Sequence, residues 1–423
     1  MTALILFGSF ILLLLLSVPI GISLGLSSLI TIVVTGVTSK EYLAQSLVSS
    51  TDSFPLMAVP FFVLAGEIMG KGGISERLFK LANVFVGRLT GGFAIAAVLT
   101  CMFFAAISGS GPATVAAVGG IMIPAMVKYG YDKKFATAVV VCAGALGIII
   151  PPSIPMVIYG ISGSVSVGDL FIAGIVPGIL IGLMLMGWSY IYSKKMGYVG
   201  VQEPFSWKNV FKTLNESKWA VFVPIIILGG IYGGYFTPTE AAVIAVVYAI
   251  IVSLFIYKEV KIRDFKNIFT ESALTSATIL LIIGTANAFG RILTLEQIPV
   301  MIADTMLAIT DNPIIILLLI NILLLFVGMV MDTTAAIIIL TPILLPIALN
   351  IGVNPIHFGI IMIVNLAIGF ITPPVGVNLF VGAGISGLKM ETLAKATFPF
   401  LISMLISLTL IVVIPQLSLL FIK

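Results

Sequence analysis

Apolar residues occur in long runs along the whole chain, separated by short polar stretches. A membrane-spanning helix needs about 20 mostly apolar residues, and most of these runs reach that length or exceed it. The first run is divided at Pro19, because proline cannot donate the hydrogen bond that a helix interior needs. The pattern predicts helical segments over residues 2–17, 19–36, 54–70, 90–127, 134–165, 169–193, 219–236, 239–257, 273–293, 313–349, 356–385 and 397–420. These segments indicate an all-α polytopic membrane protein.

The composition supports this class and excludes several others. Of the 423 residues, 60% are hydrophobic and 9% are charged, whereas a soluble domain has roughly 25% charged residues. A net charge of +4 is too small for a groove that binds nucleic acid. Two cysteines and one histidine, His357, form neither a disulfide framework nor a zinc centre. No basic residue precedes Lys40, so we expect the first run to remain as a membrane helix rather than to be cleaved as a signal peptide.

Four of the long runs are interrupted inside their apolar part. The sequence SGSGPAT interrupts 90–127 and MDTT interrupts 313–349, which predicts two re-entrant helical hairpins. A double proline lies within 134–165 and another within 356–385. Because proline removes a backbone donor, we expect both of these helices to be broken at membrane depth.

The interruptions recur at a fixed distance along the chain. A shift of 222 residues places four of the five prolines between residues 124 and 177 on another proline. The matching residues are Pro124 and Pro346, Pro151 and Pro373, Pro152 and Pro374, Pro177 and Pro399, together with Gly130 and Gly352, Gly147 and Gly369, Gly160 and Gly382, and Ser164 and Ser386. This register predicts an internal structural repeat.

The basic residues predict the orientation of the two copies. If each half crosses the membrane five times and adds one hairpin, the second half enters with the opposite orientation. With the N-terminus outside, 18 of the 21 basic residues fall on the inner side, as the positive-inside rule requires. The predicted outer loop 294–312 holds three acidic residues and no basic one. Inverted repeats with broken helices are typical of secondary transporters.

We therefore divide the chain into two inverted repeats, 1–218 and 219–423. The first has scaffold helices within 2–36, an arm at 39–53, the hairpin 90–127, the broken helix 134–165, the helix 169–193 and a cytoplasmic linker at 194–218. The second has scaffold helices within 219–257, an arm at 258–272, the hairpin 313–349, the broken helix 356–385 and the helix 397–420. The arms mix charged and apolar residues, which favours helices lying at the membrane surface.

The first hairpin tip and the first break form one candidate ion site. The tip supplies hydroxyls and open carbonyls at Ser108 and Ser110, and the break supplies carbonyls around Gly147, Ile150 and Pro151. Such neutral oxygen ligands suit Na⁺. The half-helix that begins after Pro152 and Ser153 presents its positive end, which suits a carboxylate substrate.

The second constellation lies 222 residues further along the chain. The candidate ion ligands there are Gly328, Asp332, Gly369, Thr372 and Val375. Asp332 is an acid at membrane depth, which is costly and usually functional. It can hold a cation, bind a proton, or cap the helix that follows. Thr333 and Asn378 are further candidates for contact with substrate. Arg291, near the outer end of its predicted span, either snorkels to the surface or meets an anionic substrate or partner.

Four stretches resemble one known family over essentially the whole chain. They are FTPTEAAVIAVVYA (236–249), SGSGPATVAAVGGIMIP (108–124), GIIIPPS (147–153) and GFITPPVGVN (369–378). Together they are similar to the large membrane subunit of tripartite ATP-independent periplasmic (TRAP) transporters. The resemblance implies an elevator-type fold of the ion-transporter superfamily, in which a scaffold carries a mobile domain that includes both hairpins.

The resemblance also implies a function and partners. It implies Na⁺-driven uptake, with two or more ions, of a carboxylate such as sialic acid or a C4-dicarboxylate across a bacterial inner membrane. A periplasmic substrate-binding protein would deliver the substrate, and a separate small four-helix membrane subunit would complete the transporter. The family's sodium ligands correspond by position to Ser108, Gly147, Ile150, Pro151, Gly369, Thr372 and Val375. Ala105 stands where relatives use a serine, so only its carbonyl could serve.

Other functions fit the sequence less well. A proton-coupled carboxylate carrier that uses Asp332 is the nearest alternative. A channel needs a continuous polar pore, and acids at membrane depth are few. An intramembrane enzyme needs a serine–histidine or paired-aspartate constellation, and the sole histidine lies near a predicted outer loop.

Overall fold

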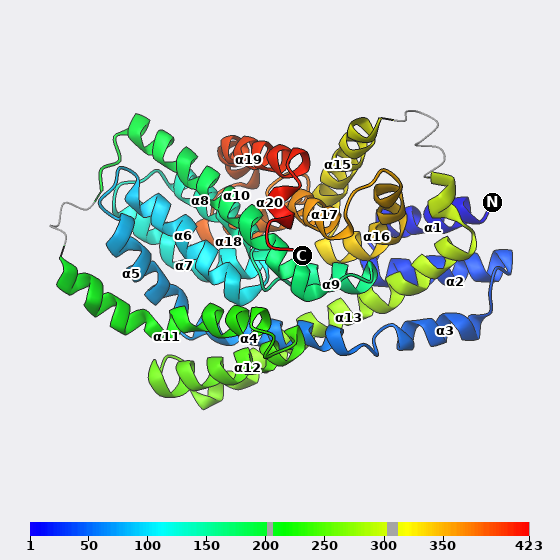
Figure 1. The fold of residues 1–423 in the computed structure, drawn as a ribbon, viewed down its shortest axis with the longest axis horizontal. Helices are drawn as coiled ribbons and strands as arrows, with labels where there is room; N and C mark the ends of the chain where they lie inside the picture. Colours follow the sequence, from blue (N-terminus) through cyan, green and yellow to red (C-terminus); the bar gives the residue numbers. More distant parts are fainter. Residues whose placement is uncertain (201–205, 303–311, 423) are drawn as a thin grey trace.

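The computed structural model describes residues 1–200, 206–302 and 312–422. Over these residues the chain is helical and contains no β-strand. Nine helices of the described part are long and apolar enough to cross a membrane. Figure 1 shows them as one elongated bundle in which α13 runs from the middle of the molecule, near α4, to the end where α2 and α3 lie.

The first repeat begins with two helices divided at Pro19, as predicted. Its elements are α1 (Thr2–Leu15), α2 (Ile20–Thr35), α3 (Lys40–Ser49), the 3₁₀ turn η1 (Phe54–Met57), α4 (Ala58–Lys71), α5 (Ile74–Val86), α6 (Gly92–Ser108), α7 (Gly111–Lys128), α8 (Lys133–Gly144), the 3₁₀ turn η2 (Ala145–Ile148), α9 (Ile154–Ser162) and α10 (Val167–Met196).

The second repeat follows the same order. Its elements are α11 (Trp207–Tyr232), α12 (Pro238–Ile251) with the π turn η3 (Val252–Ile256), the 3₁₀ turn η4 (Ile262–Asp264), α13 (Phe265–Leu295), α15 (Pro313–Val330), α16 (Thr333–Asn350), α17 (Pro355–Gly369), α18 (Val377–Ser386), α19 (Met390–Val413) and α20 (Gln416–Leu419). Part of the predicted outer loop 294–312 lies outside the described residues.

The helices confirm the register found in the sequence. A shift of 222 residues carries α7 onto α16 at both ends, and it carries α6 onto α15 within one residue at its start. Gly130 and Gly352, which follow α7 and α16, both have positive φ, +85° and +80°. Both hairpins and both broken helices are therefore present at corresponding places in the two repeats.

The two repeats interlock along α4 and α13. Helix α4 packs against α12, and α13 packs against α2, α3, α4 and α16. Lys71 on α4 forms an ion pair with Glu271 on α13, and Arg77 on α5 forms one with Glu259 at 3.2 Å. We refer to α1, α2, α4, α11, α12 and α13 as the scaffold, and to the hairpins and broken helices as the core.

Two predicted segments differ in the structure. The arm at 258–272 is not a separate helix, because α13 continues without a break from Phe265 to Leu295 and no proline interrupts it. The linker 194–218 is helical at both ends, where α10 continues to Met196 and α11 begins at Trp207. Residues 201–205 of this linker lie outside the described residues.

Helix α5 is an element that the apolar runs did not predict. Its inner face is apolar, with Ile74, Leu78 and Leu81 buried, while its other face is charged. Lys80 pairs with Glu76 at 2.7 Å, and this hydrogen bond holds the pKa of the Glu76 carboxyl below its ordinary value. A short amphipathic helix has no long apolar run, so a search for spans passes over it.

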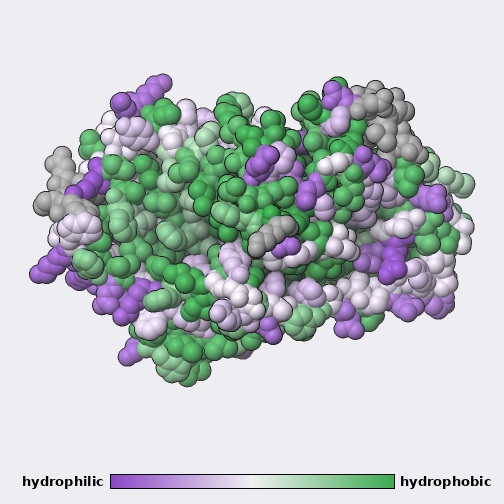
Figure 2. All heavy atoms as spheres, in the orientation of Figure 1, coloured by the Kyte–Doolittle hydropathy of each residue, from purple (hydrophilic) through white to green (hydrophobic). Residues whose placement is uncertain are grey.

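The surface agrees with a protein that lies in lipid. Apolar side chains cover most of the middle of the face in Figure 2, and many hydrophilic ones lie towards the two ends of the long axis. Large apolar residues such as Leu183, Ile322 and Phe326 are exposed. A soluble protein rarely exposes so large a continuous apolar area.

We predict that Gly369→Ala destabilises the protein. A Cβ at Gly369 would overlap the backbone of Gly328 on α15, and overpacking typically costs about 1–3 kcal/mol. The melting temperature of the purified protein in detergent should fall by several degrees. Gly384→Ala on α18 is the matched control, because nothing lies within 4 Å of its added Cβ. Equal melting temperatures for the two variants would contradict the close contact between α15 and α17.

Candidate functional site

The two hairpin tips share one cavity of about 490 Å³. The core side is formed by residues 108–113 of the first tip, 332–334 of the second tip, and the start of α9. The scaffold side is formed by Glu67 and its neighbours on α4 and by four residues of α13 between Thr275 and Ile282. The cavity therefore lies between core and scaffold, where both repeats contribute.

Three helix N-termini lie at this cavity. Helix α7 begins after Ser110, α16 begins after Asp332, and α9 begins at Ile154, and residues of all three starts line the cavity wall. The first turn of a helix carries unpaired N–H groups and a partial positive charge of roughly half an elementary charge. Three such ends favour an anion, although the lining of the cavity has no basic side chain and includes the carboxylates of Glu67 and Asp332.

The first tip carries a compact set of neutral oxygens. The hydroxyls of Ser108 and Thr114 lie 2.9 Å apart, and the Thr114 hydroxyl donates to the Ser110 carbonyl at 2.8 Å. Gly109 makes the turn with φ +60° and accepts a hydrogen bond from the Ile154 N–H at 3.3 Å. The tip is thereby joined to the first break by its backbone.

The first break adds carbonyl oxygens beside this tip. In a continuous helix the Gly147 carbonyl would accept from residue 151, but Pro151 has no N–H. The next carbonyl, of Ile148, accepts instead from the Ser153 hydroxyl at 2.6 Å. A side chain at Gly147 would overlap Ser110, so glycine allows this close approach of tip and break.

The second tip is arranged differently. The Asp332 carboxylate accepts a hydrogen bond from the Thr334 N–H at 2.9 Å and caps α16. The N–H of Val375 donates to the Met329 carbonyl at 3.1 Å, which joins the second break to its tip. The Thr372 hydroxyl, just beyond the end of α17, donates to the Ile368 carbonyl of that helix at 2.8 Å. Asp332 thus has a structural role and also lines the cavity.

The predicted site residues fall into two groups. Ser108, Ser110, Asp332 and Thr333 line the cavity. A second layer lies behind the tips and does not line it: Ala105, Gly147, Ile150, Pro151, Pro152, Ser153, Gly328, Gly369, Thr372, Val375 and Asn378. Ala105 uses its carbonyl to accept from the Gly109 N–H at 3.2 Å. The Ser153 hydroxyl caps α9.

Asn378 is a polar side chain buried between the two repeats. Its amide nitrogen donates to the Val141 carbonyl on α8 at 3.2 Å, and its side chain is fully buried. Its amide oxygen has no hydrogen-bond partner within the described protein. This oxygen lies beside the start of α7, because a Cβ added at Gly111 would be 3.2 Å from it. We predicted Asn378 as a substrate contact, and the structure places it behind the cavity.

Sequence reasoning missed several residues of the cavity and its first tip. Thr114 follows the tip by one helical turn, and that spacing could have pointed to it. Glu67, Thr275 and Thr278 come from the scaffold, and no motif in the sequence pairs them with the tips. Among the described residues, no three histidine, cysteine, aspartate or glutamate side chains cluster as a metal site. The oxygens at the first tip are instead neutral.

Comparisons with known proteins agree with this architecture. The model of the family described as "Tripartite ATP-independent periplasmic transporter, DctM component" matches residues 7–417. The chain is 16% identical, with a TM-score of 0.62, to the Alcanivorax borkumensis YdaH transporter, and the match covers 89% of each chain. At that identity the likeness shows the fold alone.

Curated relatives are similar over nearly the whole chain. It is 52% identical to the isethionate TRAP transporter permease protein DctMQ of Oleidesulfovibrio alaskensis, across 99% of this chain and 66% of that protein. It is 45% identical to the C4-dicarboxylate TRAP transporter large permease protein DctM of Pseudomonas aeruginosa, across 94% and 93%. It is 38% identical to the sialic acid TRAP transporter large permease protein SiaM of Vibrio cholerae, across 95% and 94%. All three are named as transporter permeases rather than enzymes.

The cap at Asp332 gives a prediction about stability. Asp332→Ala removes the acceptor for the Thr334 N–H, and the loss of such a cap costs about 0.5–2 kcal/mol. Asp332→Asn keeps an acceptor oxygen, so we expect it to melt close to the wild-type temperature while the alanine variant melts lower. A thermal-melting series on the three purified proteins checks this. If the asparagine variant melted as low as the alanine variant, the charge rather than the cap would be stabilising.

Proposed function

Because the chain belongs to the DctM family of tripartite ATP-independent periplasmic transporters, we propose that it carries a small organic anion into a bacterial cell, driven by Na⁺. The observation that supports this most directly is the cavity at which three helix N-termini from both repeats converge. Relatives named for isethionate, C4-dicarboxylates and sialic acid transport anions of different size. The shared requirement is one carboxylate or sulfonate group, which helix N-termini recognise through their N–H groups.

Sodium coupling is supported by the donor set at the first tip. The hydroxyls of Ser108 and Thr114 and the carbonyls of Ser110 and Gly147 are neutral oxygens gathered in a small space. Hard oxygen ligands suit an alkali cation. A bound Na⁺ would add positive charge next to the cavity and strengthen anion binding. At the second tip the proposed ligands are the carbonyls near Gly328 and Gly369 and the Asp332 carboxylate.

The division into core and scaffold supports an elevator mechanism. The cavity wall is shared between the two parts, so movement of the core along α4 and α13 would carry the tips from one side of the membrane to the other. A ligand shifts such an equilibrium only by its differential affinity for the two states. Tips that hold both Na⁺ and substrate would be ordered, and the core could then move. Tips that hold only Na⁺ or only substrate would not allow this movement.

The relatives also support the partners and the orientation that we propose. The chain spans 66% of the length of its isethionate relative, which leaves room in that protein for a further membrane part. We propose a separate small four-helix membrane subunit and a periplasmic substrate-binding protein as partners of this chain. We place the chain in the bacterial inner membrane, as its family implies, and the distribution of basic residues supports periplasmic N- and C-termini.

Replacement of Na⁺ tests the coupling. We expect the complete transporter in vesicles to accumulate its anion with an inward Na⁺ gradient and to lose accumulation when K⁺ replaces Na⁺. Thr114→Val removes a hydroxyl of the first tip and should raise the Na⁺ concentration for half-maximal uptake by about tenfold, which corresponds to about 1.4 kcal/mol for the lost contact between the ion and the hydroxyl oxygen.

Thr100→Val is the matched control for this measurement. The Thr100 hydroxyl is also buried on the first hairpin, but it donates only within its own helix, to the Ala96 carbonyl at 2.7 Å. Its sodium dependence should stay at the wild-type value. Undiminished uptake in K⁺ would refute sodium coupling.

A proton-coupled carrier is the second candidate, because Asp332 is the acid of the core that lines the cavity. Asp332→Asn separates the two functions, since it keeps the cap and removes the titratable group. In a proton-driven carrier this variant would lose all uptake driven by a pH gradient. In a sodium-driven carrier it should retain part of its Na⁺-driven uptake, which is the outcome that we expect. Initial rates under each gradient in turn make the distinction.

A further inference from the structure

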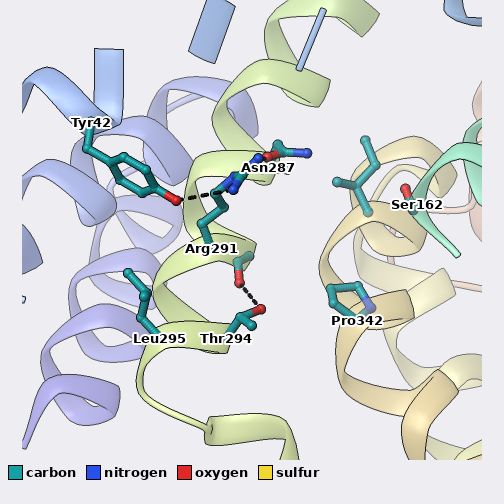
Figure 3. A pocket seen from close by; sticks show the side chains of 10 residues that line it. Tyr42, Ser162, Asn287, Arg291, Thr294, Leu295 and Pro342 are labelled. Atoms are coloured by element: carbon teal, nitrogen blue, oxygen red, sulfur yellow. Dashed lines mark hydrogen bonds between the residues drawn. The ribbon is translucent and has the colours of Figure 1, made fainter. Parts of the chain in front are cut away.

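A second cavity, of about 380 Å³, lies further along α13. Figure 3 shows its two walls. One wall belongs to the scaffold and the arm, with Tyr42 on α3 and Asn287, Arg291 and Thr294 on α13. The opposite wall belongs to the core, with Ser162 at the end of α9 and Pro342 on α16. Like the first cavity, this second cavity therefore lies between the core and the scaffold.

Arg291 is a cation of this cavity that has no counter-ion among the described residues. Its guanidinium donates to the Tyr42 hydroxyl at 3.1 Å and to the Asn287 amide oxygen at 3.4 Å, and it lies 5.9 Å from the Tyr42 ring centre. These partners are neutral. No ion pair found among residues 1–200, 206–302 and 312–422 includes Arg291. A guanidinium remains protonated at any physiological pH, so its full charge is available to an anion.

The same face of α13 lines both cavities. Thr275, Ile279 and Ile282 line the first cavity, and Ala286, Gly290 and Thr294 line the second. These positions follow one another at intervals of three or four residues, so they share one helical face. From Thr278 to Arg291 the helix rises about 20 Å.

The facing wall has the same continuity. On α16, Thr334 lines the first cavity, whereas Ile338 and Pro342 line the second, again at intervals of four. Helices α13 and α16 pack against each other. The two cavities therefore lie one after the other between the same pair of helices, and α16 extends from the second tip towards Arg291.

We propose that Arg291, oriented by Tyr42 and Asn287, is the residue that binds the carboxylate or sulfonate group of the substrate at the outer face. This inference rests on the proposed transport function and its orientation. A shift of the core along α13 brings the second tip from Thr278 towards Arg291, where the fixed cation and the helix N-termini face the same anion. The planar guanidinium binds either acid group with two parallel hydrogen bonds.

The test is transport by the complete complex of large subunit, small subunit and binding protein in right-side-out vesicles. Isethionate, succinate and N-acetylneuraminate serve as probes. For the anion that wild type accumulates, Arg291→Gln should raise KM at the outer face at least about tenfold. Arg291→Lys should give a smaller rise, because an ammonium keeps the charge and lacks the planar fork. KM measured from the inner face should not change.

Lys40→Gln is the matched control. Lys40 is an exposed base on the same arm as Tyr42, and it does not line the cavity. This variant should leave both KM values at the wild-type level. A residue that merely snorkels to the membrane surface would behave in the same way, so unchanged outer KM for Arg291→Gln would overturn the inference.

Two further measurements distinguish this inference from a docking role of Arg291 and from the proposed transport function. If Arg291→Gln weakened association of the substrate-free binding protein with the membrane subunits, Arg291 would be a docking residue and the inference would be wrong. Anion-dependent rises in melting temperature report binding without transport. If an anion raises the melting temperature of wild type and raises that of Arg291→Gln less, the inference is supported. This holds even if wild type shows no Na⁺-driven accumulation, because that result contradicts only the proposed function. Absence of both accumulation and stabilisation in wild type would overturn both.

Discussion

Backbone groups inside a membrane must find hydrogen-bond partners within the protein, because lipid offers none. Each broken helix of this chain meets that requirement at the tip of its own hairpin. The Ile154 N–H donates to the Gly109 carbonyl in the first repeat, and the Val375 N–H donates to the Met329 carbonyl in the second. Both bonds need close backbone contact, which glycine provides at Gly147 and Gly369. Non-helical chain is thus held at one level of the bundle, and the polar cavity forms there.

The two repeats satisfy their backbone groups with different chemical groups. The first break is buried and lies beside serine and threonine hydroxyls, whereas Pro373, Pro374 and Val375 of the second break are exposed. At the second break the Gly369 carbonyl accepts from the Thr372 N–H and the Phe370 carbonyl from the Asn378 N–H. At the corresponding place in the first break, the Ile150 N–H donates to the Leu146 carbonyl and not to Gly147. An inverted repeat gives the chain two tips, but it does not make the two tips chemically identical.

The sequence predicted the parts of the fold that depend on local physics. Long apolar runs indicated the spans, and paired prolines indicated both breaks, because proline acts on its own helix. The merged arm in α13 was not foreseen, because no breaker separates it from the span that follows. The helix α5 was not foreseen, because an amphipathic helix has no long apolar run. The tips were predicted from SGSGP and MDTT, but the scaffold wall with Glu67 and Thr278 was not. Its place opposite the tips depends on packing between repeats, which no spacing in one sequence encodes.

The placement of charge suits the moving core that we propose. A full positive charge carried through the bilayer with every turnover would be costly, and helix N-termini attract an anion with partial charges only. The core contributes three such ends to the cavity, and its one carboxylate there, Asp332, would be compensated by a bound cation. The fixed scaffold can hold a permanent cation at one end of the path, where it meets the substrate but does not travel. In the mechanism that we propose, capture by Arg291 and carriage by the helix ends are then separate tasks, and each falls to the part of the protein that can perform it at low cost.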